Sequence, residues 1–223
     1  MLNAIRSVSL ALCLLAAPLG AEAETVITGL VRSQGGQPLP GLALLEKGEI
    51  HNNRWDRGAL VDAGGRFRIE LAEGGQYGLH VYASGYLYKP NAVKVETGKT
   101  LEVKIELVPE PTRANDPVIK RVEFVPPETG KGRMRITMDV FDPNGDLGPQ
   151  VLAFNAATGR AFAMAPPSWV WSLKSNYPNG VYQLDVDPSD RRDWHFTVAD
   201  HKCNTADILG FPHQPTPAQV IKQ

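Results

Sequence analysis

The sequence predicts an all-β protein made of two consecutive β-sandwich domains after a signal peptide. Three observations lead to this prediction. Beyond residue 23, short apolar/polar alternations recur, and no window keeps one apolar face at helical spacing across three turns. A proline-rich segment interrupts the alternation near the middle of the chain. The first residues have the pattern of an export signal.

Residues 1–23 are predicted to be a secretory signal peptide. Arg6 supplies a positive charge, residues 7–20 form an apolar run, and Ala21-Glu22-Ala23 fits the small-x-small cleavage rule. The run is shorter than the roughly 20 residues that span a bilayer. We therefore expect a periplasmic or secreted protein that begins at Glu24 and has no membrane span after the signal is removed.

The charge and cysteine content exclude one class of function and one source of stability. Lys and Arg total 23 and Asp and Glu total 24, so the chain lacks the basic character of a nucleic-acid binder. Removal of the signal peptide, with Cys13, leaves Cys203 as the only thiol. No intramolecular disulfide can then form, and stability must come from packed cores.

Residues 24–108 are predicted to form the first domain. The stretch GRFRIEL places Phe67, Ile69 and Leu71 on one face, and YGLHVYA and LEVKIEL alternate in the same way. Such segments are half-buried strands, with one face in a core and the other in water.

The turns and strands of this region resemble the carboxypeptidase regulatory-like domain, a transthyretin-like β-sandwich. The matching positions are Gly29, Gly36, Pro38, Leu39, Gly41, Gly65, Phe67, Gly75, Tyr77, Gly85 and Tyr86. The resemblance implies a non-catalytic module used for folding, tethering or binding. Residues 46–59 depart from the pattern, because they are longer and more polar than a hairpin connection and contain Trp55.

Residues 109–117 carry three prolines and no apolar alternation, which predicts a linker. Alternation resumes over residues 118–210. The stretches DPVIKRVEFVP, ITMDVFDPNGDLGPQVLAFN and NGVYQLDVD resemble a bacterial immunoglobulin-like module, which implies a second β-sandwich. Residues 211–223 are predicted to be a flexible tail.

The stretch FDPNGDLG is the first candidate for a metal site. Asp142, Asn144 and Asp146 match the first three ligands of a calcium loop, but Leu147 stands where glycine is required and Ala153 where a bidentate glutamate is required. Asp-Pro-Asn-Gly is also a strong turn sequence. The turn is the favoured interpretation, and calcium the alternative.

Two further groups of residues are candidate binding sites. His195, His201 and Cys203 could offer two imidazoles and a thiolate to a metal ion, although a strand followed by a turn is favoured. Trp169, Trp171 and Tyr177 could stack on a sugar or on a partner, as could Trp55. For Trp169 and Trp171, burial in a core is the favoured interpretation.

No catalytic motif is present, so the sequence predicts a protein that is not an enzyme and needs no cofactor. We expect an exported binding or assembly module, an accessory or structural component of a cell-envelope or extracellular complex. Its partner would be another envelope or extracellular protein. A carbohydrate-binding protein, whose partner is a glycan, and a metal-binding periplasmic protein are the alternatives.

Overall fold

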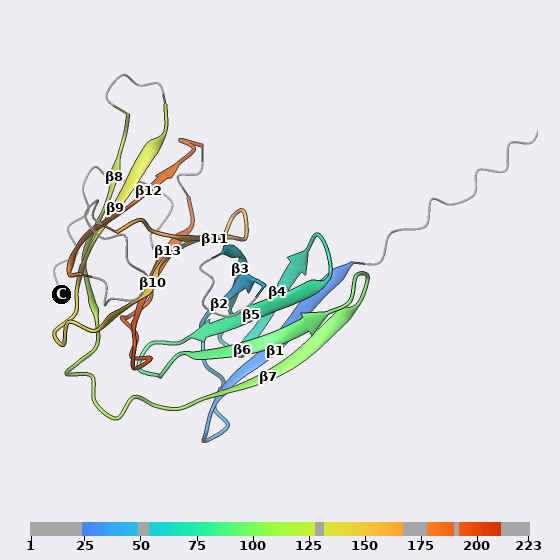
Figure 1. Ribbon diagram of the computed structural model, residues 1–223. Helices are drawn as coiled ribbons and strands as arrows, with labels where there is room; N and C mark the ends of the chain where they lie inside the picture. Colours follow the sequence, from blue (N-terminus) through green and yellow to red (C-terminus); the bar gives the residue numbers. More distant parts are fainter. Residues whose placement is uncertain (1–23, 49–53, 128–131, 167–177, 190–191, 211–223) are drawn as a thin grey trace, which may run out of the picture.

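The computed structural model describes residues 24–48, 54–127, 132–166, 178–189 and 192–210. Within these ranges the chain is built from strands and their connections, with no helix (Figure 1). The predicted all-β class is therefore confirmed. The same ranges contain no helix with the length and apolar character needed to cross a membrane.

Two facing layers of strands make up the N-terminal half. One layer is ordered β4 (Arg66–Leu71), β1 (Thr25–Ser33), β7 (Thr100–Leu107). The other is ordered β3 (Trp55–Val61), β2 (Gly41–Lys47), β5 (Gly75–Tyr82), β6 (Lys89–Val95). Strand β1 runs antiparallel to β4 and parallel to β7. Inward side chains such as Ile27, Phe67 and Leu79 form the core between the layers.

The C-terminal half repeats this arrangement with different strands. One layer is ordered β12 (Gly180–Val186), β9 (Met134–Phe141), β8 (Val118–Val125). The other is ordered β14 (Leu209–Gly210), β13 (Trp194–Asp200), β10 (Leu147–Asn155), β11 (Arg160–Ala163). Its core contains Tyr182, Trp194 and Phe196.

The two halves are joined through one continuous eight-stranded sheet, which the sequence did not predict. Strand β11 pairs with β3 at Arg160 and Arg57, and the Gly58 amide donates a hydrogen bond of 2.9 Å to the Gly159 carbonyl oxygen. Figure 1 shows β11 beside β3 at this joint. A third buried cluster spans the joint, formed by Leu42, Leu44, Tyr82, Tyr88, Leu152, Phe154, Ala161 and Ala199. We refer to it as the shared core.

Residues 109–117, predicted to be a linker, do connect β7 to β8, but they are not free of the rest of the fold. Asp116 and Pro117 are buried. Glu110 accepts a hydrogen bond of 2.9 Å from the amide of Thr205, which lies beyond β13. The connection is therefore docked onto the C-terminal half, although the predicted domain boundaries themselves stay a prediction.

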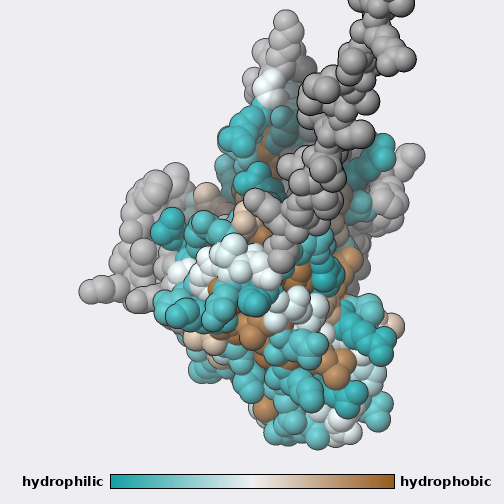
Figure 2. All heavy atoms as spheres, turned by 90° about the vertical axis from the view of Figure 1, so that its right-hand side faces the viewer, coloured by the Kyte–Doolittle hydropathy of each residue, from teal (hydrophilic) through white to brown (hydrophobic). Residues whose placement is uncertain are grey.

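Hydrophobic atoms form narrow areas interrupted by hydrophilic ones on the face of the molecule in Figure 2. Large exposed apolar side chains among the described residues are correspondingly scattered over residues in or next to several different strands: Leu60, Val108, Val125, Phe141 and Val181. A partner that binds this face would need polar contacts in addition to apolar ones.

Candidate functional site

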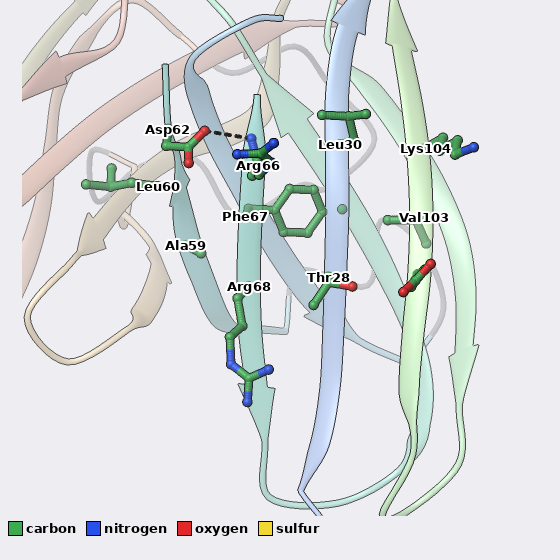
Figure 3. A pocket seen from close by; sticks show the side chains of 12 residues that line it. Thr28, Leu30, Ala59, Leu60, Asp62, Arg66, Phe67, Arg68, Val103 and Lys104 are labelled. Carbon is green, nitrogen blue, oxygen red and sulfur yellow. Dashed lines mark hydrogen bonds between the residues drawn. The ribbon is translucent and has the colours of Figure 1, made fainter. Parts of the chain in front are cut away.

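An open groove among the described residues is centred on Gly29 and has a volume of about 970 Å³ (Figure 3). Three consecutive residues from each of three neighbouring strands line it, and β3 and its following turn complete the wall. The lining residues are Thr28–Leu30 of β1, Arg66–Arg68 of β4, Glu102–Lys104 of β7, and Ala59, Leu60 and Asp62.

Strand register explains why the groove lies at Gly29. Gly29 is paired with Phe67 on one side and with Val103 on the other. The ring of Phe67 extends toward Gly29 (Figure 3). A Cβ atom at position 29 would lie 2.2 Å from Phe67 Cε1, so only glycine leaves room for the ring.

The turn between β3 and β4 fixes the upper end of the groove. Asp62 Oδ1 accepts hydrogen bonds from the amides of Gly64 (2.8 Å) and Arg66 (2.9 Å; Figure 3). The Asp62 amide donates to the Arg66 carbonyl oxygen at 2.9 Å. Gly65 has a φ of 76°, a left-handed conformation that favours glycine. Both backbone polar groups of Arg66 are therefore satisfied within the turn.

Beyond Arg66, β4 has an open edge. In an antiparallel pair, alternate residues direct both backbone polar groups toward the partner strand. The Gly65 carbonyl accepts from Val31 of β1, whereas the groups of Arg66 bond to Asp62 on the opposite side. It follows that Arg68 and Glu70 also direct their amides and carbonyls away from β1. The described residues offer these four groups no backbone hydrogen bond.

A second cavity of about 360 Å³ continues along this open edge. It shares Ala59, Leu60 and Arg68 with the groove and extends to Thr158 and Gly159, in the turn between β10 and β11. Both halves of the chain thus border one groove that follows β4. We call it the β4 groove.

The charged side chains of β4 are exposed and partly paired. Arg68 contacts Glu24, and its Nε donates to Glu70 Oε1 at 3.2 Å. These side chains are about half exposed or more, so each ion pair adds less than about 1 kcal/mol to stability. Arg68 and Glu70 give the groove a charged rim.

The predicted turn at residues 142–145 is confirmed. The Asn144 amide donates to Asp142 Oδ1 at 3.1 Å, and the Gly145 amide donates to the Asp142 carbonyl at 3.3 Å. Asp142 is buried, and desolvation raises the pKa of its carboxyl. Asp146 instead pairs with Lys202 at 2.8 Å, which lowers the pKa of Asp146.

The structure does not bring the predicted histidine and cysteine ligands together. His195 lies at the start of β13, half-buried near the ring of Phe154, and burial lowers its pKa. His201 and Cys203 lie beyond the opposite end of the same strand. In the part of the chain that the structure describes, no three or more histidine, cysteine or carboxylate side chains are grouped to hold a metal ion.

The aromatic candidates divide in two. Trp55 is half-buried, packs against the shared core, and has its ring centroid 4.8 Å from that of His80. Trp169, Trp171 and Tyr177 lie outside the described residues, so their role as a sugar platform stays a prediction.

A buried polar chain at the joint between the halves was missed by sequence reasoning. The Tyr82 hydroxyl donates to Gln150 Oε1 at 3.1 Å, and Gln150 Nε2 donates to the Tyr88 hydroxyl at 2.9 Å. Nearby, His80 Nε2 lies 3.1 Å from Glu46 Oε2, with both side chains buried. Burial also raises the pKa values of both tyrosines. The two hydrogen bonds of Gln150 connect the C-terminal half to Tyr82 and Tyr88 of the N-terminal half.

The comparison with protein families identifies the N-terminal half. Residues 26–108 match the carboxypeptidase regulatory-like domain, which confirms the resemblance seen in the sequence. Residues 26–108 are therefore a carboxypeptidase regulatory-like domain within the chain. No curated protein sequence matches the chain.

Several solved structures are similar to the chain. The minor pilin GBS52 of Streptococcus agalactiae is 24% identical over 41% of this chain, with a TM-score of 0.33, and this chain spans only 47% of that pilin. The shaft pilin SpaA of Lactobacillus rhamnosus GG is 12% identical, with coverage of 86% and 99% and a TM-score of 0.34. A proposed carbohydrate binding protein of Bacteroides uniformis is 11% identical, with coverage of 84% and 98% and a TM-score of 0.30.

Proposed function

We propose that the chain is an exported, non-enzymatic assembly module that binds an extended segment of another envelope or extracellular protein along the β4 groove. The observation that carries this proposal is the open edge of β4. Arg68 and Glu70 present two amides and two carbonyls beside a groove large enough for a polypeptide segment. Main-chain pairing at such an edge supplies affinity, and neighbouring side-chain contacts supply specificity.

The wall of the groove supports the same function. Leu60, whose relative exposure is 44%, offers an apolar contact, and Arg66 and Lys104 offer charged ones. Strand edges that are not used for binding are commonly protected by charged residues and proline. Both edge strands carry charged residues, but β6 also contains Pro90, whereas β4 has no proline and borders a groove.

The joint between the halves suits a structural component. The eight-stranded sheet and the shared core extend through both halves, so a segment bound at β4 is held by a body that includes the C-terminal half. Thr158 and Gly159 of that half border the groove directly.

Site-specific photo-crosslinking in the native host tests this function. A photoreactive residue replaces Leu60 in the groove, or Val181, an exposed residue of β12 that serves as the control position. We expect a discrete covalent adduct with an envelope or extracellular protein from position 60 and none from position 181.

The adduct at position 60 should disappear in Arg68→Pro, because proline removes an outward amide without breaking a bond to β1. Lys94→Pro is the matched control. The Gln76 carbonyl accepts from Gly48, so Gln76 directs its backbone polar groups away from β6. Lys94 is paired with Gln76, and Pro90 lies four residues earlier on β6, so the backbone nitrogens of both residues point away from β5. Adducts that persist in a folded Arg68→Pro variant would refute edge binding.

A further inference from the structure

The segment that connects the two halves carries two buried carboxyl groups. The Glu110 side chain is 0% exposed, and the Asp116 side chain is 7% exposed. Glu110 Oε1 accepts from the Thr205 amide at 2.9 Å and lies 3.3 Å from the Thr205 hydroxyl, which also contacts the Tyr86 carbonyl at 3.1 Å. Glu110 therefore ties the connecting segment to the loop after β13.

Among the described residues, Arg113 is the cation that faces these carboxyl groups. Arg113 Nε donates to Asp116 Oδ2 at 2.9 Å, and Arg113 Nη2 donates to Asp207 Oδ1 at 2.7 Å. Arg113 Nε is 3.9 Å from Glu110 Oε2, beyond hydrogen-bond distance. With all groups ionised, three carboxylates would share a single guanidinium.

Two carboxyl oxygens of the described residues have no hydrogen-bond partner after these contacts are assigned. Glu110 Oε2 and Asp116 Oδ1 are buried and have no hydrogen-bond partner within the described ranges when both groups are treated as acceptors. Both carboxyl groups lie beside the same Arg113 guanidinium, and a side-chain hydrogen bond with Asp116 is one of the causes that raise the pKa of Glu110. A single proton between them turns two unsatisfied acceptors into one hydrogen bond.

We propose that Glu110 and Asp116 form a proton-operated latch, which holds the connecting segment on the C-terminal half while they share a proton and loosens it when the proton leaves. This device is independent of binding at the β4 groove. In the closed state, Glu110 Oε2–H donates to Asp116 Oδ1, and Glu110 Oε1 accepts from Thr205. Loss of the proton leaves two buried like charges, with Arg113 already engaged by Asp116 and Asp207.

The ionisation of Glu110 determines whether the latch stabilises the fold at low or at high pH. Desolvation is the main reason that the pKa of Glu110 is raised to about 7; the charge of Asp116 acts in the same direction, and the hydrogen bond from the Thr205 amide opposes the shift. Because the folded-state pKa lies above the ordinary value of 4.5, the latched state binds the proton more tightly than the unfolded chain. The stabilisation is fully present below pH ~4.5 and is lost as the pH rises through about 7.

Chemical unfolding at two pH values tests the latch. A pKa of about 7 against 4.5 predicts that the folding equilibrium constant falls roughly 30-fold between about pH 5.5 and 8.5 through this group alone. Glu110→Gln should remove that component, because its amide can donate to Asp116 at either pH. Glu106→Gln, an exposed neighbour on β7, should keep the wild-type pH dependence. Equal pH dependence in wild type and Glu110→Gln would overturn the proposal.

A direct titration covers the case in which Glu110→Gln does not fold. Carboxyl carbon shifts of the wild-type protein should show a resonance that titrates near pH 7 and disappears in Glu110→Asp or moves in Asp116→Asn. Hydrogen exchange at the Thr205 amide, corrected for the intrinsic pH effect, should accelerate over the same range. If all glutamate resonances titrate near 4.5, the latch does not exist.

Discussion

Gly29→Ala gives a sharp test of the packing beneath the β4 groove. The added methyl group would lie 2.2 and 2.3 Å from two atoms of the Phe67 ring and 2.9 Å from Val103 Cγ2. Carbon atoms pack at about 3.5–4.0 Å, so the ring must move by more than an ångström. Phe67 is buried and packs in the N-terminal core, so a displaced ring loses part of its core packing.

The expected loss of stability is about 2 kcal/mol. Overpacking of a core typically costs about 1–3 kcal/mol, and a clash with three atoms places this change near the upper end; replacing a strand glycine recovers about 0.5–1 kcal/mol of backbone entropy, which leaves about 2 kcal/mol. For a chain of this size, a loss of about 2 kcal/mol lowers the melting temperature by about 4–8 °C. Urea unfolding at fixed pH and calorimetry would measure both quantities.

Two further variants test whether the clash with the Phe67 ring causes the loss of stability. Gly35→Ala is the control, since the nearest atom to its new methyl would be Ser33 Oγ at 3.7 Å, and it should change stability by less than about 0.5 kcal/mol. Phe67→Leu should make room, so that the double variant with Gly29→Ala is less destabilised than the sum of the single changes by at least about 1 kcal/mol. Additive losses would refute the proposed clash.

Three other predictions follow from the buried and half-buried groups. Calcium added after chelation should leave the melting temperature unchanged, whereas a site at hundredfold excess would add about 2.7 kcal/mol; a calcium-dependent rise that Asp142→Ala abolishes would contradict the turn. Tyr88→Phe should cost about 1–3 kcal/mol by leaving Gln150 Nε2 without its acceptor, and an equal loss in Tyr86→Phe would count against this reason. Cys203 should react only partially with a thiol reagent in the native protein at neutral pH, because burial raises its pKa, and complete rapid labelling would show otherwise.

The strands of this fold were largely predictable, because most have one face in a core and one in water. The alternation of GRFRIEL and LEVKIEL matches the burial of β4 and β7. The joint was not predicted, although β2 carried a signal for it. Its sequence GLALLEK is apolar on both faces, which indicates burial from two sides, and the second side belongs to the shared core.

The sites were less predictable than the strands. The open edge of β4 depends on which strands pair with it, and alternation does not reveal pairing partners. Glu110 and Asp116 occur in a polar, proline-rich segment whose local pattern gives no sign of burial. Their burial comes from contacts with Thr205 and its neighbours, which are remote in the sequence.

The shared core also determines the order in which the protein can fold. During synthesis the N-terminal half appears first, and its residues Leu42, Leu44 and Tyr82 belong to the shared core. Phe154 and Ala199, which help to cover them, follow much later in the sequence. Strand β1 likewise cannot form its parallel pairing until β7 has been synthesised. Contacts of such long sequence separation form slowly, and the N-terminal half meanwhile exposes a surface prone to aggregation. We therefore expect the N-terminal half alone to aggregate more readily than the whole chain.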